Sequence, residues 1–132
     1  TMQQNPQYDD VMSDVRHFFD DRLTACEAAG IARERVIFDP GFGFGKTAEH
    51  NFHLLAHLRD LCLDGHPILV GLSRKSMIAS VLDRTPEERV FASVALALMA
   101  VERGASIVRV HDVAATADAL AMWGALPRSI DR

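Results

Sequence analysis

The sequence predicts an α/β fold built around a parallel sheet. Three short apolar runs, residues 36–38, 68–70 and 107–110, are each bounded by charged or turn-forming residues. Strands that are buried on both faces of a parallel sheet have this appearance. Each run is followed by a loop and then by apolar residues at helical spacing, so the chain is predicted as one helix followed by three β-loop-α units.

The first predicted helix precedes the first strand. An aspartate, either Asp9 or Asp10, is expected to cap its start, and Gly30 stands where a glycine commonly follows a helix. Its apolar residues recur at the spacing of one helix face: Val11, Val15, Phe18, Leu23 and Cys26.

A glycine-rich loop, residues 41–47, follows the first strand and leads into a helix that carries Leu54, Leu55, Leu58 and Leu61. The loop resembles a phosphate-binding P-loop, but that pattern requires a glycine where Pro40 stands. The dinucleotide pattern GxGxxG fails as well, because its third glycine falls on Lys46. We interpret the loop as a mobile segment that approaches a ligand closely, with its two phenylalanines able to flank a flat ring.

Three further helices are predicted after the second strand. A short helical piece covers residues 77–82, and a final helix runs from His111-Asp112 to about Trp123. Between them, a long helix over residues 86–103 begins with Thr85 as N-cap and Glu88 at the third position, and stops at Gly104.

The spacing of the strands fits one of two architectures. The three strands start at Val36, Ile68 and Ile107, which are 32 and 39 residues apart. A (β/α)₈ barrel uses about 31 residues per unit, although a doubly wound sheet has the same order of elements. Three strands cannot close a barrel.

Composition and charge exclude several classes of protein. With 14 basic and 18 acidic residues among 132, the net charge of −4 argues against nucleic-acid binding through bulk positive charge. The most apolar stretch, residues 90–101, falls short of the ~20 residues that span a bilayer, so no membrane segment is expected. Cys26 and Cys62 lack metal-type spacing and indicate reduced thiols of a cytoplasmic protein.

Polar residues follow all three strands at their carboxyl ends. Asp39 ends the first, residues 73–76 follow the second, and residues 109–112 end the third. Each group alone is explained by helix caps and turns. Three in succession favour a shared ligand site, because the carboxyl ends of parallel strands meet at one edge of a sheet.

Two histidine arrangements have different interpretations. Arg109 and His111 stand two residues apart on a strand and should point the same way, as a seat for phosphate or diphosphate. His50, His53 and His57 lie on one side of a helix, but without an HExxH pattern they indicate a solvated polar face. No metal-ligating residue is assigned.

Three strings, DPGFGFGKT followed by His50-Asn51, PILVGLSRKSMI and IVRVHDV, closely resemble bacterial dihydropteroate synthases. The likeness covers nearly the whole chain in order. It implies a TIM barrel, of which residues 1–132 would be the C-terminal half: helix five, then strands six to eight with their helices, as one partial pterin-binding domain. In that family, 7,8-dihydropterin-6-ylmethyl diphosphate condenses with 4-aminobenzoate to give 7,8-dihydropteroate and diphosphate for folate biosynthesis.

The resemblance also implies roles for single residues on the pterin and aminobenzoate side. Asp39 would accept hydrogen bonds from the pterin's 2-amino and ring N–H groups. Lys75 would reach the pterin ring and brace the aminobenzoate, and Ser76, at a helix start, would meet its carboxylate. Gly43 and Phe44 would wall the aminobenzoate side.

At the diphosphate side, the resemblance implies that Arg109 and His111 hold the leaving group while its charge grows, so that these two residues and Lys75 are catalytic. It also implies Mg²⁺, but the linked asparagine belongs to the first barrel loop, which is not part of this sequence. A homodimer through the late helices is implied as well, and a fragment alone is expected to be inactive or nearly so.

Two other functions stay open on the sequence. A pterin-binding methyltransferase domain would share the fold and bind a reduced folate, but it would need no seat for diphosphate. A non-catalytic half-barrel remnant would carry the same motifs without turnover.

Overall fold

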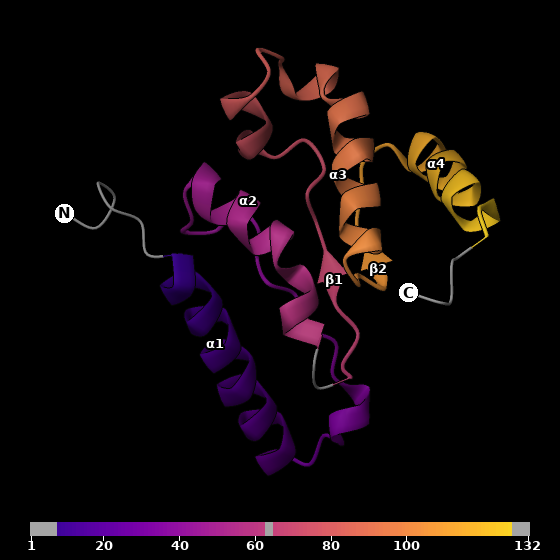
Figure 1. Cartoon of the computed structure of the whole chain (residues 1–132). Coiled ribbons are helices and arrows are strands. Elements are labelled where there is room, and N and C mark those ends of the chain that lie inside the picture. Colours follow the sequence, from indigo (N-terminus) through magenta and orange to yellow (C-terminus); the bar gives the residue numbers. More distant parts are fainter. Residues whose placement is uncertain (1–7, 63–64, 128–132) are drawn as a thin grey trace.

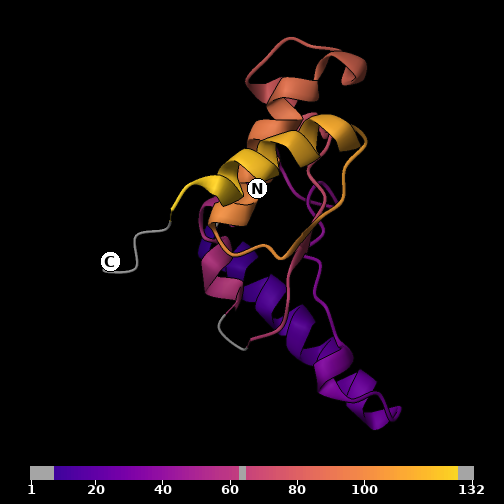
Figure 2. The ribbon, with the colours of Figure 1, turned by 90° about the vertical axis from the view of Figure 1, so that its right-hand side faces the viewer.

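The computed structural model describes residues 8–62 and 65–127, which contain four α-helices and a small parallel sheet (Figure 1). In the view of Figure 1, α1 and α2 lie to the left of β1, and α3 and α4 lie to its right. Figure 2 shows α4 crossing in front of α3, against which it packs. The helices are α1 (Tyr8–Ala28), α2 (Ala48–Ala56), α3 (Val90–Glu102) and α4 (Val113–Ala125).

The sheet is parallel, as predicted, but shorter than predicted. Strands β1 (Leu69–Val70) and β2 (Ile107–Val108) pair with Leu69 opposite Ile107. The strand predicted over residues 36–38 is reduced to a single parallel bridge from Phe38 to Ile68. The strand predicted over residues 107–110 ends at Val108. Within residues 8–62 and 65–127 neither outer edge has a further partner strand, so nothing extends these ladders.

The two faces of the sheet differ in burial. Phe38, Ile68 and Val70 point to the helices and are at most 7% exposed. On the other face, Ile37 is 50% and Ile107 is 40% exposed. Because side chains alternate along a strand, one face is packed and the other is an open apolar surface. An open inner face is what a barrel lacking its other strands would have.

Helix α1 packs on the sheet through the predicted face, except that a different phenylalanine is buried. Val11, Val15 and Leu23 are buried as predicted, but Phe18 is 57% exposed. Its neighbour Phe19 is buried instead and stacks on Phe38, with ring centroids 4.2 Å apart. The helix already includes Tyr8, so the prediction that Asp9 or Asp10 is its N-cap is wrong. Gly30 follows the helix end with a φ of 91°, as a terminating glycine does.

Several predicted helices are broken into shorter pieces. Helix α2 begins after Thr47, whose hydroxyl accepts from the His50 N–H, and it ends before a separate 3₁₀ turn at Leu58–Cys62. The helix predicted over residues 77–82 is a 3₁₀ segment, Ser76–Ser80. The capping box of Thr85 and Glu88 is confirmed, but it opens a 3₁₀ turn, and α3 starts only at Val90.

Candidate active site

The carboxylate that ends the first strand segment lies against the arginine that follows β2. Nη1 of Arg109 is 3.4 Å from Oδ2 of Asp39, and the other carboxylate oxygen accepts the Gly41 N–H at 2.9 Å. The Arg109 and Asp39 side chains are 58% and 39% exposed. This exposure leaves both partners accessible to a ligand. An ion pair this exposed also contributes little to stability.

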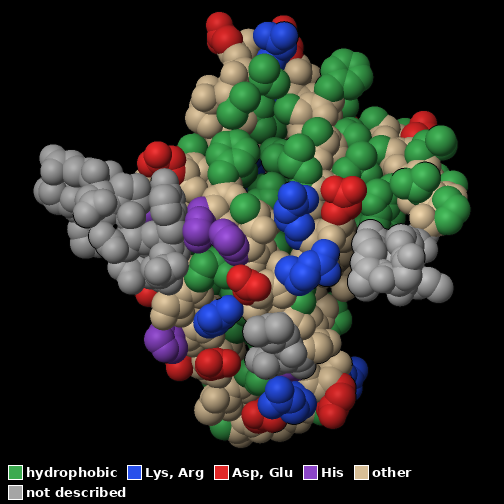
Figure 3. Space-filling model, in the orientation of Figure 1, with side chains coloured by type: hydrophobic (Ala, Val, Ile, Leu, Met, Phe, Trp, Pro, Cys, Tyr) green, Lys and Arg blue, Asp and Glu red, His purple; other side chains and the backbone are tan. Residues whose placement is uncertain are grey.

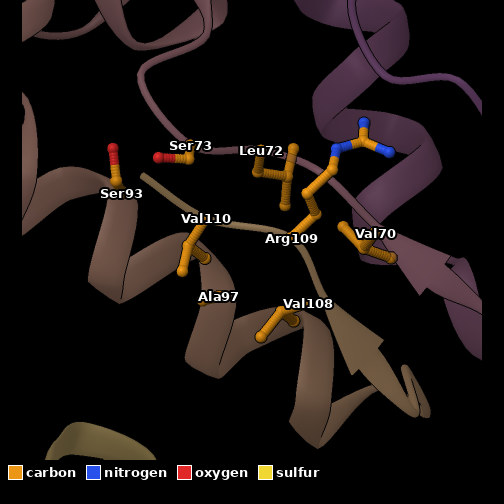
Figure 4. A pocket seen from close by; sticks show the side chains of 8 residues that line it. All are labelled: Val70, Leu72, Ser73, Ser93, Ala97, Val108, Arg109 and Val110. Atoms are coloured by element: carbon orange, nitrogen blue, oxygen red, sulfur yellow. The ribbon is translucent and has the colours of Figure 1, made fainter. Parts of the chain in front are cut away.

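A glycine makes room for this arginine. Gly71, directly after β1, is buried, and a Cβ placed on it would collide with the Arg109 guanidinium. Figure 4 shows Arg109 pointing away from α3, whereas Val108 and Val110 on either side of it point toward that helix. The alternation that predicted the direction of Arg109 therefore holds as far as Val110.

The glycine-rich loop is held by side chains at both ends. The Gly43 N–H donates to Oδ1 of the buried Asn51 at 3.0 Å. The Lys46 ammonium donates to the carbonyls of Gly41 and Phe44 at 3.0 and 3.2 Å. Burial lowers the pKa of Lys46, and the nearby Asp39 carboxylate opposes that shift. The lysine of the P-loop-like string is thus engaged with its own loop.

Lys75 joins this loop from the segment that follows β1. Its ammonium lies over the Phe44 ring, 4.6 Å from the centroid. Its side chain passes beside Gly43, where an added Cβ would be in van der Waals contact with it. Phe44 is 70% exposed, so the ring and the ammonium together form an accessible surface. A flat ring bearing a negative group would fit it through stacking and charge attraction.

His111 is anchored to the same segment by a buried serine. Oγ of Ser73 accepts the His111 backbone N–H at 3.1 Å and lies 2.9 Å from Nδ1 of its ring. Ser73 is only 7% exposed, whereas His111 is exposed. Among the described residues, the other ring nitrogen, Nε2, makes no hydrogen bond.

Arg74 and Asp112 form the bidentate ion pair of this region. The guanidinium donates to the two carboxylate oxygens at 2.9 and 3.3 Å. The hydrogen bond from Arg74 holds the pKa of Asp112 below its ordinary value, and the same contact raises the pKa of Arg74. The Arg74 N–H donates to Oγ of the buried Ser93 at 2.8 Å.

The residues predicted from sequence thus fall into three contacting sets: Asp39 with Arg109, Lys75 with Gly43 and Phe44, and His111 with Ser73. Figure 3 shows basic side chains gathered near the middle of one face, with acidic ones between them. Ser76 is exposed at the start of a 3₁₀ segment of five residues. So short a segment has little dipole, which removes that part of the argument for an anion at Ser76.

Two structural contributors, Gly71 and Asn51, carry no role in the sequence patterns. Asn51 stands inside a quoted string, but nothing about its spacing reveals that it accepts the Gly43 N–H. Gly71 directly follows the strand predicted over residues 68–70 and precedes the polar cluster, and a glycine in or beside a strand often marks close approach of another group.

Metal binding and membrane insertion find no support in the described part of the chain. Among residues 8–62 and 65–127, no group of three or more His, Cys, Asp or Glu side chains could hold a metal ion. The expected Mg²⁺ stays a prediction. In the same ranges, no helix is long and apolar enough to cross a membrane.

Comparison with known proteins places these residues in a family. Over 125 residues the chain is 53% identical to a dihydropteroate synthase of Haemophilus influenzae, covering 95% of this chain and 46% of that protein. It is 49% identical to the Escherichia coli dihydropteroate synthase over 120 residues, covering 91% of this chain and 43% of that one. The chain therefore spans less than half the length of these curated relatives.

Solved structures agree with the fold. The chain superposes with a TM-score of 0.87 and 52% identity on Xanthomonas albilineans dihydropteroate synthase in complex with 7,8-dihydropteroate, covering 92% of this chain and 48% of that one. A Yersinia pestis dihydropteroate synthase with a sulfonamide drug gives a TM-score of 0.87 at 49% identity, covering 94% and 45%. The predicted fold class, a partial (β/α)₈ barrel, is confirmed. Residues 1–111 match the description "Pterin binding enzyme", and the chain belongs to that family.

Proposed function

We propose that this chain is the C-terminal half-barrel of a dihydropteroate synthase, with residues 1–132 as one partial pterin-binding domain. The substrates would be 7,8-dihydropterin-6-ylmethyl diphosphate and 4-aminobenzoate. The contact between Asp39 and Arg109 carries this proposal. It joins a hydrogen-bond acceptor to a cation, and a pterin diphosphate offers the complement, a ring edge with N–H donors and an anionic end.

The reaction would separate this pair. Asp39 would turn to the pterin's 2-amino and ring N–H groups, and Arg109 would turn to the diphosphate with His111. As the C–O bond to the methylene carbon breaks, negative charge grows on the departing diphosphate, and contacts that strengthen then lower the barrier. The aminobenzoate nitrogen forms the new C–N bond and loses a proton.

The second substrate would sit on the surface made by Lys75 and Phe44. The aromatic ring of 4-aminobenzoate can lie against Phe44 and Gly43, while the Lys75 ammonium and the Ser76 hydroxyl take its carboxylate. The position of the Lys75 ammonium over the exposed Phe44 ring supports this arrangement.

Asp39→Asn is the variant that tests the pterin side. It keeps the shape but replaces one acceptor oxygen by an N–H₂ donor facing the pterin donors. In a complete barrel we expect pterin affinity to weaken by about 1–3 kcal/mol while 4-aminobenzoate binding changes little. Calorimetry with each ligand separately is the measurement, and an unchanged pterin affinity would count against the assignment.

A diphosphate-release assay with both substrates tests the reaction itself. We expect turnover from a complete barrel containing these residues and little or none from the 132-residue chain alone. A pterin-binding methyltransferase is the alternative, and inorganic diphosphate distinguishes it: a synthase half-barrel should bind diphosphate through Arg109 and His111, whereas a methyltransferase needs no such seat.

We further propose that the complete protein is a cytoplasmic homodimer joined by its late helices. The support for the dimer is the apolar surface on α3 and α4, where Phe91 is 85% and Met122 is 74% exposed. The support for the cytoplasm is that Cys26 and Cys62 are both free.

A further inference from the structure

The segment after β1 contains a backbone conformation that its own sequence does not favour. Arg74 has a φ of 58°, the one non-glycine residue with positive φ in residues 8–62 and 65–127. A side chain with a Cβ is disfavoured there, so surrounding contacts must hold the conformation.

Those contacts come from the elements on either side. The Arg74 N–H donates to Oγ of Ser93 in α3, and its carbonyl accepts from Nη1 of Arg89 at 2.9 Å, just before α3. Its guanidinium spans 38 residues of sequence to the carboxylate of Asp112, at the start of α4. The backbone and side chain of Arg74 therefore tie the segment after β1 to the starts of two helices.

The residues next to this pair are the ones placed in the candidate site. Lys75 follows Arg74, and His111 precedes Asp112. A second link runs parallel to the first, because Ser73 accepts the His111 backbone N–H. Two consecutive residues of one segment are thus bound to two consecutive residues of the other.

We propose that Arg74 and Asp112 are positioning residues that set the distance between Lys75 and His111. Arg74 does not face a ligand in this role, because its guanidinium is committed to Asp112 and its side chain is only 30% exposed. The consequence for the reaction rests on the proposed function, in which Lys75 serves the aminobenzoate and His111 serves the diphosphate. Loss of the pair would leave the link between Ser73 and His111 without its neighbour, so the two binding segments would be held less rigidly.

Amide hydrogen exchange tests the pair without any ligand. In the full-length protein, Arg74→Gly and Asp112→Asn should each lower the protection of the Arg74 and His111 amides at least ~10-fold. The Arg109 amide, which donates to Val70 in the sheet, should keep its protection. Arg74→Gly is chosen because glycine tolerates positive φ, so this variant removes the side chain without adding backbone strain.

Arg33→Ala is the matched control. It deletes an arginine from another ion pair, with Glu27 at 3.8 Å, whose side chains are about half exposed. Both site amides should stay protected in this variant. Unchanged protection in Arg74→Gly would overturn the proposal, because the pair would then not hold the two segments. An equal loss of protection in α1 and α2 would overturn it as well, because the pair would then stabilise the whole fold and not this region.

Kinetics in the complete barrel then tests the positioning role. Each single variant should lower kcat at least ~10-fold, and the double variant should be no worse than either single one, since both remove the same contact. Arg74→Lys should recover part of the loss by keeping the charge. Additive losses would overturn the proposal. Absence of turnover in the parent protein would count against the proposed function alone, while the exchange result still decides whether Arg74 and Asp112 hold the two segments together.

Discussion

At the scale of single residues, the candidate site depends on which side chains are absent as well as on those present. Gly71 leaves the space in which the Arg109 guanidinium lies, and that position brings Arg109 to Asp39. The Arg109 side chain is 58% exposed, so its displacement costs little packing energy. A change at Gly71 should therefore affect the site more than the fold.

Gly71→Ala tests this separation. The new methyl group should push Arg109 from its place and weaken binding of inorganic diphosphate at least ~10-fold, while the free energy of unfolding changes by less than about 1 kcal/mol. Calorimetry and urea unfolding measure the two effects. Gly124→Ala in α4 is the control, because a Cβ there meets nothing within 4 Å. Equal diphosphate affinity in both variants would contradict the role of Gly71.

Lys75→Ala tests the cation above the Phe44 ring. In a complete barrel its turnover should fall at least ~10²-fold, the size expected for removing one well-placed electrostatic group. Lys75→Arg keeps the charge with a different shape and should retain more activity than Lys75→Ala. Steady-state kinetics with both substrates is the measurement, and near-normal turnover in Lys75→Ala would reject the assignment.

At the scale of elements, the sequence predicts best what local contacts decide. Gly30 ends α1, and the capping box of Thr85 and Glu88 forms, because each depends on residues within one turn. The three apolar runs were identifiable as strand segments, but their lengths depend on neighbouring strands. Phe18 and Phe19 are adjacent phenylalanines, and the sheet contact that selects Phe19 has no local signature.

The same reasoning separates the predictable from the unpredictable part of the site. Polar residues after each strand indicate one edge of the sheet, and the contact of Asp39 with Arg109 agrees with this although 70 positions separate them. The pair of Arg74 and Asp112 has no periodic pattern, since neither helix nor strand spacing relates its members. Only the folded arrangement of β1, α3 and α4 brings Arg74 and Asp112 together.

The ion pair between Arg74 and Asp112 should make the stability of the protein depend on pH in the acidic range. The hydrogen bond from Arg74, together with the charges of Arg74 and His111, lowers the pKa of Asp112 from its ordinary value of 3.8. A carboxyl with a lowered folded-state pKa stabilises the fold above the unfolded value, and that contribution is lost as the pH falls through the folded value. The contribution should therefore be complete at neutral pH and disappear only below about pH 4.

Urea unfolding of the parent protein and of Asp112→Asn, from about pH 7 to about pH 3, measures this dependence. The parent should be the more stable at neutral pH, and the difference should shrink toward the acidic end. The capping contact with Thr85 also lowers the pKa of Glu88. Glu88 is present in both proteins, so the loss of its contribution to stability at low pH cancels in the comparison. A difference that stays constant with pH would show that the Asp112 charge is not involved.

At the scale of the whole molecule, two apolar surfaces need different partners. The open sheet face with Ile37 and Ile107 faces the side where the remaining strands of a barrel would stand. The second surface lies on α3 and α4, on the other side of the sheet, and Figure 3 shows hydrophobic side chains over these helices. Completing the barrel would cover the first surface and leave the second exposed.

The second surface therefore predicts association that persists in a complete barrel. Phe91 is 85% exposed on α3, while the buried residues of that helix, including Leu96 and Ala100, already face the fold. Phe91→Glu should shift a complete barrel from dimer to monomer at least ~10-fold in dissociation constant, because it places a charge in an apolar contact. Phe18→Glu is the control, since Phe18 is 57% exposed on α1. Sedimentation equilibrium distinguishes the two: a parent protein that is already monomeric, or equal weakening by both variants, would show that α3 is not the interface.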